Sequence, residues 1–293
     1  MFRDAYEISI QYTFPVVQFV LTFEGKCDAG IGAFVVVNPE GWIITAAHIV
    51  EQMVAVNKAA NDIIAWEKNT QAVRDDNSIS AKERSRRLSS LGTPNKKAAK
   101  RAGTAWLDNV TLRDVSILKD ADLAVARLDG FDPTRVKAYP TFKDPTKNFR
   151  PGASLCKLGY PFAELKPTYD PAANHFGLPS GTEVTFFPIE GIFTRTLNVP
   201  NPSPDPGFPV AFVETSSPGL KGQSGGPTFD VHGNIWAIQS QTRSLPLDFS
   251  PEIKDGGQKL KEHQFLNVGM GVHVQTVLGF LNQLGVKHTV SAA

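Results

Sequence analysis

Short apolar runs separated by turn residues dominate this chain, a pattern typical of β-strands. In the first half, the runs that predict strands are Val16–Phe23, Ile31–Val37, Trp42–Ala46, Val110–Leu112, Val115–Leu118 and Leu123–Leu128. In the second half they are Ala153–Leu158, Glu183–Phe187, Gly191–Leu197, Val210–Glu214, Gly225–Phe229, Ile235–Ser240 and Val268–Val274. The pattern therefore predicts an all-β protein with many turns.

A different period interrupts the strands between residues 52 and 104. Apolar residues recur there at helical spacing, at positions Met53, Val56, Ala60 and Ile63. Ser80 and Glu83 predict a capping box, and Gly92 predicts the end of that helix. Thr93 and Pro94 predict the start of a further helix that Gly103 would end. We therefore expect a helical insertion in a β domain.

Other residue patterns predict a turn, two surface loops and a C-terminal helix. Asn38–Gly41 has turn chemistry at every position. Lys166–Pro179 and Asn198–Pro209 carry too many prolines for ladder pairing, so both are expected to be surface loops. Near the end, Val277, Leu281 and Leu284 precede Gly285 and predict an amphipathic helix.

Composition narrows the class of protein. The 293 residues carry a net charge of +1, so the overall charge does not favour binding to nucleic acid or to an anionic membrane.

The two cysteines, Cys27 and Cys156, lie in apolar runs, and we expect two buried thiols rather than a disulfide. Phe14–Phe23 is much shorter than a membrane span and follows Asp4 and Glu7. It therefore predicts a strand of a cytoplasmic protein, not a signal peptide.

The most informative motif is Gly-Gln-Ser-Gly-Gly-Pro, at Gly222–Pro227. A serine needs a base and an orienting acid to act as a nucleophile. His48 follows a predicted strand and Asp122 opens another, so the chain order His48, Asp122, Ser224 is that of a known triad. Each residue alone has a simpler explanation: a glycine-rich turn, a core histidine, or a turn aspartate for which Asp120 is a rival. The order and the strand contexts together favour a triad.

These segments resemble those of trypsin-like serine proteases with the chymotrypsin fold, and most closely the bacterial Deg (high-temperature-requirement) branch. The resemblance implies two six-stranded antiparallel β-barrels: residues 10–130 with the insertion at 52–104, and residues 145–275, followed by a helix and tail at 275–293. It implies that His48 is the general base, Asp122 its orienting partner and Ser224 the nucleophile of an acyl-enzyme. The backbone N–H groups of Gly222 and Ser224 would form the oxyanion hole. No cofactor or metal site is expected.

The resemblance also suggests how substrate binds. Ser240, Gln241 and Thr242 would pair with the substrate backbone, and Lys221 is expected to bind substrate as well. Pro218 occupies the position of the aspartate that selects Arg or Lys, so a small or medium apolar residue is the default expectation before the scissile bond. His273 would fall on a strand of the primary pocket, where it would pair with an acidic side chain or face away.

Two further departures concern activation and regulation. Gln223 replaces an aspartate that binds a new N-terminus in digestive members, so no trypsin-type cleavage is expected to activate the protein. About twenty residues follow Val274, so the resemblance predicts no PDZ domain after it.

Possible partners follow from charge and from the resemblance. Eight Lys/Arg against one Glu lie between Lys82 and Arg101, which indicates either a solvated helical face or a docking surface, at residues 80–103, for an acidic partner or nucleic acid. Deg-like proteins are often trimers, and aromatic residues near the N-terminus would form an interface or belong to the core: Phe2, Tyr6, Tyr12 and Phe14.

Three functions follow from the sequence. The first is a soluble, cofactor-free cytoplasmic serine endopeptidase that acts on proteins or peptides and is gated by a partner or by the ordering of a loop. The second is a catalytically silent member of the same family that acts as a binding module. The third is a scaffold or nucleic-acid-linked regulator in which proteolysis is secondary.

Overall fold

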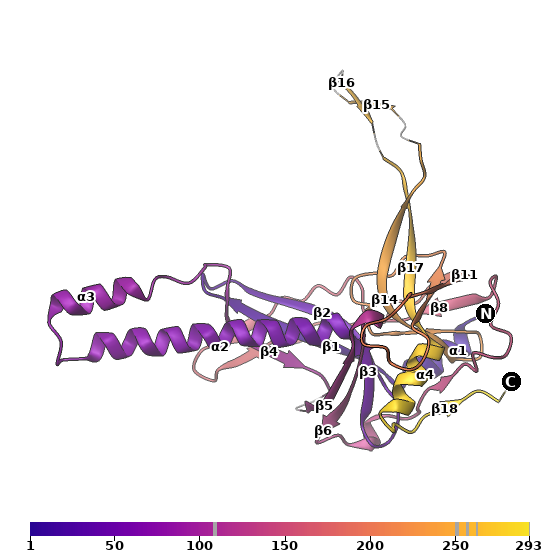
Figure 1. The fold of residues 1–293 in the computed structure, drawn as a ribbon, viewed down its shortest axis with the longest axis horizontal. Helices are drawn as coiled ribbons and strands as arrows, with labels where there is room; N and C mark the ends of the chain where they lie inside the picture. The colour runs from indigo at the N-terminus through magenta and orange to yellow at the C-terminus, as the bar shows by residue number, and fades with distance from the viewer. Residues whose placement is uncertain (108–109, 250–251, 256–257, 262, 293) are drawn as a thin grey trace.

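The computed structural model describes residues 1–292 except 108–109, 250–251, 256–257 and 262. Two β-sheets form its centre (Figure 1). A pair of helices extends from one side of this centre, and a long β-hairpin extends from another. The centre therefore carries two projections that lie on different sides of it.

The first sheet is six-stranded and antiparallel. Its order is β4 (Ala99–Ala105), β1 (Thr13–Thr22), β2 (Cys27–Val36), β3 (Trp42–Ala46), β6 (Leu123–Asp129) and β5 (Thr111–Leu118). The turn Asn38–Gly41 joins β2 to β3, with Gly41 at φ +80° and its N–H bonded to the carbonyl of Asn38. Among the described residues β4 and β5 do not pair, so this sheet is a half-barrel, consistent with the first of the two β units that the resemblance implies.

The second sheet closes on itself. Its ring consists of β13 (Pro227–Phe229), β8 (Ser154–Lys157), β11 (Ile189–Asn198), β12 (Ala211–Thr215), β17 (Phe265–His273) and β14 (Asn234–Pro246), and β14 pairs back with β13. Outside this ring, the short strand β7 (Thr141–Phe142) pairs with β14, and β18 (Thr289–Val290) pairs with β7, both in parallel. The fold is therefore the chymotrypsin-like arrangement of two β units.

One apolar core joins the two sheets. It contains Phe34 and Ile44 from the first sheet and Ile238 and Val272 from the second. Helix α4 (Val274–Gln283) buries its apolar face in the same core, as the spacing of its residues predicts. Because one core spans both sheets, the groups between them are held in a fixed relation.

The insertion forms helices α2 (Ala47–Asp75) and α3 (Ala81–Ser90). Ser80 caps α3 by accepting a hydrogen bond from the N–H of Glu83 at 3.2 Å, and Gly92, at φ +62°, follows its end. The helix predicted between Thr93 and Gly103 is wrong. Strand β4 takes its place, because the free edge of β1 offers backbone partners that outweigh the local helix signals.

Two other expectations are corrected. Glu183–Phe187 has no regular strand; instead the Phe187 N–H bonds to the carbonyl of Gly159. The proline-rich loop Lys166–Pro179 contains a hairpin of β9 (Thr168–Asp170) and β10 (His175–Gly177). Its prolines flank these short strands and so do not interrupt the ladder. The second such loop, Asn198–Pro209, carries no strand beyond its first residue.

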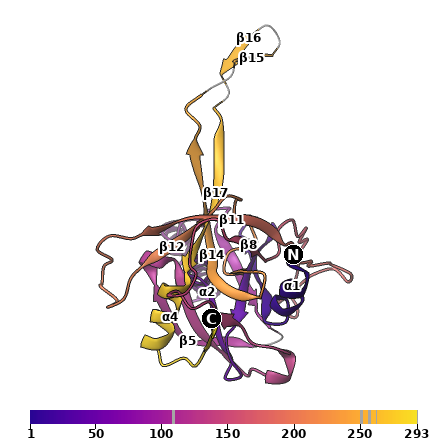
Figure 2. The ribbon, with the colours of Figure 1, turned by 90° about the vertical axis from the view of Figure 1, so that its right-hand side faces the viewer.

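Helix α1 (Arg3–Ser9) packs on the second barrel, close to the N-terminus (Figure 2). The rings of Phe2 and Tyr6 meet those of Phe229 and Phe186. Tyr12 is fully buried, and Phe14 stacks on the core residue Phe34. The four aromatic residues near the N-terminus thus contribute to packing within the chain.

The remaining elements are short or lie on the hairpin arm. Two 3₁₀ turns, η1 (Lys119–Ala121) and η2 (Pro133–Arg135), flank β6. Strands β14 and β17 continue past the barrel as a ribbon that leads to β15 (Glu252–Asp255) and β16 (Gln258–Lys261) (Figure 1). Cys27 and Cys156 are free thiols on different sheets. In the described part of the chain, no helix combines the length and the apolar character needed to span a membrane.

Candidate active site

The imidazole of His48 is held by Asp122. His48 lies in the first turn of α2, directly after β3, and Asp122 lies between η1 and β6. His48 Nδ1 is 2.8 Å from Asp122 Oδ2, and the backbone N–H of His48 donates to Asp122 Oδ1 at 2.8 Å. The rival Asp120 instead accepts from the N–H of Ser203 at 2.7 Å, so Asp122 is the partner of the histidine.

Asp122 has an unusual backbone conformation. Its φ is +51°, in the left-handed region that a non-glycine residue occupies only at a cost. Its carbonyl accepts from the N–H of Ala47 at 2.9 Å, which ties it to the start of α2. The strain is therefore maintained by contacts that place the carboxylate against the imidazole.

Ser240 completes the environment of this carboxylate. Its hydroxyl donates to Asp122 Oδ2 at 2.5 Å. Ser240 lies where the β14–β17 register shifts, so the bulge turns it out of the ladder. Sequence reasoning treats Ser240 only as a substrate-binding residue, and nothing in its local pattern indicates this second contact.

The two titratable groups shift one another's pKa in opposite directions. The hydrogen bond that the imidazole donates to Asp122 is the main cause of a raised pKa at His48. At Asp122, burial alone would raise the pKa, but the hydrogen bonds from His48 and Ser240 outweigh it and lower the pKa. The carboxylate is therefore charged at neutral pH and stabilises the protonated imidazole.

Ser224 and His48 line one cavity of about 450 Å³. Strands β1 and β2, helix α2 and the loop that contains the motif Gly222–Pro227, called the nucleophile loop below, contribute to it. In the described part of the chain, Ser224 Oγ donates to the carbonyl of Ser240 at 3.3 Å and not to the imidazole. Hydroxyl–imidazole bonds of such pairs often tighten only when substrate binds. The structure thus brings the base and the serine hydroxyl to the same cavity, with the hydroxyl turned toward Ser240.

Backbone bonds around Ser224 leave two N–H groups unused within the described residues. The N–H groups of Gln223, Gly225 and Gly226 donate to backbone carbonyls, whereas those of Gly222 and Ser224 have no such partner. Gly222 has φ +97°, and a Cβ on it would strike the carbonyl oxygen of Tyr160. Glycine is thus required here on both conformational and steric grounds.

Gln223 holds this loop from beneath. Its side chain is fully buried, its Oε1 accepts from the N–H of Leu220 at 2.9 Å, and its Nε2 donates to the carbonyl of Phe187 at 3.2 Å. A neutral amide thus satisfies both polar groups with partners inside the chain. An incoming ammonium would find no carboxylate at this position.

Of the residues expected to bind substrate, Lys221 lines the cavity that contains Ser224. Gln241 and Thr242 follow Ser240 on β14. Thr242 Oγ1 donates to the carbonyl of Gly219 at 2.5 Å, next to Pro218.

His273 does not lie at the cavity. Its ring packs on that of Phe149 with centroids 4.3 Å apart, and its Nδ1 accepts from the N–H of Gln275. Burial lowers its pKa to about 4. The structure therefore places it as a buried helix cap rather than as a pocket residue.

The basic insertion is partly neutralised by its own acids. Glu83 pairs with Arg86 and Arg87, and Glu67 on α2 pairs with Lys100 and Arg101. The surface charge of residues 80–103 is thus smaller than the sequence count implies.

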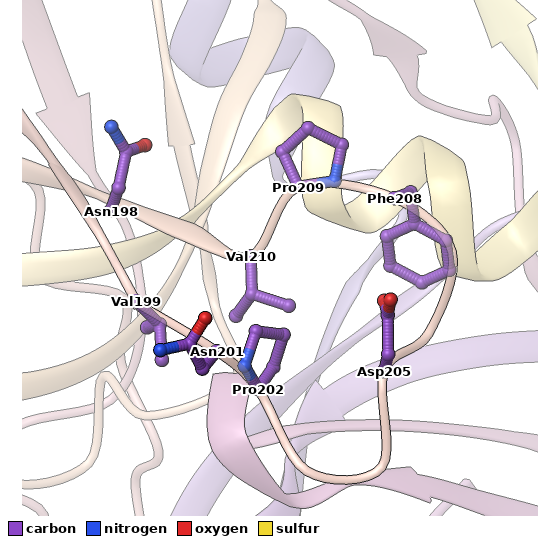
Figure 3. A pocket seen from close by; sticks show the side chains of 8 residues that line it. All are labelled: Asn198, Val199, Asn201, Pro202, Asp205, Phe208, Pro209 and Val210. Atoms are coloured by element: carbon purple, nitrogen blue, oxygen red, sulfur yellow. The ribbon is translucent and has the colours of Figure 1, made fainter.

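A second cavity, of about 370 Å³, lies in the loop Asn198–Pro209 (Figure 3). The rings of Phe208 and Pro209 and the carboxylate of Asp205 line it, and Asp205 Oδ1 accepts from the N–H of Gly207. The residues that line it include no histidine and no serine, so it lacks the constellation found at the first cavity.

Comparison with known proteins bears on the family. Among solved structures, two chains of the HtrA-type protease AlgW with a tripeptide match with TM-scores of 0.49 and 0.48 and identities of 15% and 14%. The alignments cover 98% and 97% of this chain, which spans 64% and 63% of those chains. Structural similarity at these TM-scores and identities does not by itself assign the chain to a branch of proteases. A search of curated proteins finds no match.

A family model described as a trypsin-like peptidase domain matches residues 32–238. This range exceeds half of the chain and includes His48, Asp122 and Ser224. With the two β units and the histidine–aspartate pair beside the serine, the match shows that the chain belongs to the trypsin-like peptidase family.

Proposed function

We propose that this protein is a serine endopeptidase that cleaves peptide bonds through an acyl-enzyme on Ser224. One observation carries the proposal: His48, paired through Nδ1 with the partly buried carboxylate of Asp122, shares a cavity with Ser224. Imidazole is a suitable base because its ordinary pKa, about 6.5, lies near neutrality.

The reaction uses the groups in a fixed order. Ser224 Oγ turns from the carbonyl of Ser240 to His48 Nε2, gives up its proton and attacks the substrate carbonyl carbon. Asp122 stabilises the imidazolium that forms. His48 then passes the proton to the leaving amine, and water, deprotonated by His48, releases the acid product and restores the serine hydroxyl.

The unused N–H groups of Gly222 and Ser224 would receive the negative oxygen of the tetrahedral intermediate. Loss of one such donor typically lowers the rate by ~10² to 10³. The buried amide of Gln223 supports the loop without an ammonium, so we propose that activity does not require trypsin-type cleavage of the N-terminus.

The test is covalent labelling by a fluorophosphonate probe together with peptide hydrolysis. We expect wild type to be labelled, Ser224→Ala and His48→Ala to lose labelling, and Ser89→Ala, which changes an exposed serine on α3, to keep it. Loss of labelling in Ser89→Ala, or its persistence in Ser224→Ala, would place the reactive group elsewhere. A wild-type protein that neither reacts with the probe nor hydrolyses any peptide would favour a catalytically silent binding module.

A partner at residues 80–103 remains a prediction. Lys82, Lys96 and Lys97 carry no ion pair within the described part of the insertion, so they would supply its charge. Binding of an acidic protein or nucleic acid there would weaken steeply with salt and disappear when residues 80–103 are deleted. Salt-insensitive binding, or binding retained after the deletion, would contradict it.

A further inference from the structure

The second barrel contains a lysine that is completely buried. Lys157 lies on β8, and its side chain has no exposed surface. Its neighbour on the same face of the strand, Leu155, packs inside the barrel with Phe193 and Val213. Lysine is almost never fully buried unless its charge is paired.

The ammonium of Lys157 has three acceptors and all are uncharged. Nζ donates to Thr215 Oγ1 at 3.1 Å, to the carbonyl of Ser217 at 2.5 Å and to the carbonyl of Pro218 at 2.8 Å. Burial lowers the pKa of Lys157 to about 7. In the described part of the chain no carboxylate pairs with it, so no counter-ion offsets the effect of burial on its charged form.

This cation lies directly behind the strand that follows Ser240. Gly269 on β17 is the register partner of Thr242 on β14. A Cβ added to Gly269 would lie 2.7 Å from Nζ of Lys157, so only a glycine leaves room for the ammonium. Pro218, whose carbonyl it binds, precedes Ser224 by six residues. Pro218 and Thr242 are both expected to contact substrate, and Nζ therefore lies beside the space between them.

That space is closed in this structure. Thr242 Oγ1 donates to the carbonyl of Gly219 across it, and a Cβ on Gly219 would strike Nε2 of Gln239. A substrate side chain that enters must part Thr242 from Gly219. Behind them it would meet the carbonyls of Ser217 and Pro218 and the ammonium that they bind.

We propose that Lys157 determines specificity by binding an acidic side chain, Asp or Glu, immediately before the scissile bond. The substrate carboxylate replaces one of the two carbonyls as acceptor and supplies the missing counter-ion. The bonds to the carbonyls already have a charged donor, but a carboxylate adds a charged acceptor and so the attraction of opposite charges, which a carbonyl does not supply. Arg or Lys at that substrate position would be repelled. This inference rests on the proposed peptidase function and names the substrate class of the same site.

The experiment compares peptides that differ only at the residue before the scissile bond, with Glu, Gln, Leu or Lys there. We expect wild type to cleave the Glu peptide with a kcat/KM about 10- to 100-fold above that of the Gln peptide, in line with a hydrogen bond to a charged group. Lys157→Met should remove this ratio and keep hydrolysis of the Leu peptide, and Lys157→Arg should retain a preference for Glu.

A matched control is Lys143→Met. Lys143, which follows β7, is also buried, but its ammonium lies over the ring of Trp236. It should leave the Glu-to-Gln ratio unchanged. If Lys157→Met does not fold, the wild-type ratio and Lys157→Arg decide the question.

The outcomes separate this proposal from the one on which it rests. A wild-type protein that reacts with the fluorophosphonate probe and hydrolyses peptides, but does not distinguish Glu from Gln, overturns the role of Lys157 alone. A Glu preference that survives in Lys157→Met does the same. If wild type neither reacts nor hydrolyses any peptide, the peptidase function itself fails.

Discussion

Replacement of Gln223 by methionine tests whether its buried amide holds the nucleophile loop. Methionine has a similar length and is apolar, so Gln223→Met largely preserves packing and removes two hydrogen bonds, to the N–H of Leu220 and the carbonyl of Phe187. Each lost hydrogen bond leaves one backbone group, the N–H of Leu220 or the carbonyl of Phe187, without a hydrogen-bond partner, at a cost of about 1–2 kcal/mol. The sum is about 2–4 kcal/mol, which lowers the unfolding midpoint by roughly 5–15 °C in a chain of this size.

The same substitution should affect catalysis more than stability. The N–H groups of Gly222 and Ser224 flank Gln223, so a loosened loop displaces both proposed oxyanion donors. We expect kcat/KM for peptide hydrolysis to fall by ~10² to 10³ at a temperature well below the unfolding transition. The assays are thermal unfolding and steady-state hydrolysis.

The control for this prediction is Gln275→Met, which changes an exposed glutamine on α4. It should leave both the unfolding midpoint and kcat/KM close to wild type. If Gln223→Met behaves like this control in both assays, the buried amide does not hold the loop and the reasoning is wrong.

Three further predictions follow from the site. Because the general base must be neutral and the pKa of His48 is raised, the acid limb of the kcat/KM–pH profile should lie above the ordinary value for histidine; Asp122→Asn should move it to lower pH, and an unmoved limb would contradict the assignment. Ser240→Ala should lower kcat about 10-fold by removing the bond to Asp122, with little change in the far-UV spectrum; an unchanged kcat would show that the bond is dispensable. Gly222→Ala should destabilise the protein by several times the ~1–2 kcal/mol expected for Gly207→Ala, which also has a positive φ but open space around it; equal midpoints in thermal unfolding would refute the steric argument.

Part of the candidate site follows from local sequence. Serine between glycines, histidine after a strand and aspartate before one are short-range signals. The structure places His48 and Ser224 on one cavity and Asp122 against the imidazole of His48. Asp120 lies in the same turn, and the sequence favours Asp122 because it directly precedes the strand, as the family pattern requires. The structure pairs the carboxylate of Asp122 with His48 and that of Asp120 with Ser203.

The contacts of Lys157 and His273 could not be predicted from local sequence. Lys157 is one lysine in an apolar strand, and nothing nearby in the chain indicates that Ser217 and Pro218 surround its ammonium. His273 lies on a strand whose direction could be anticipated, but its ring turns away to Phe149. In both cases the deciding contacts join residues far apart in the chain.

The sequence by itself determined the class of fold, the order of most strands, the first helix pair of the insertion and the triad candidates, because these depend on periodicity and on motifs of a few residues. Only the tertiary structure decided that residues 99–105 form a strand, that the first sheet is a half-barrel, and that an unpaired lysine lies behind the strand of Ser240. A free strand edge forms hydrogen bonds with any backbone that the fold brings beside it, and a barrel interior holds a polar side chain only where the fold supplies its hydrogen-bond partners. Both depend on residues far apart in the chain, so local sequence does not determine them.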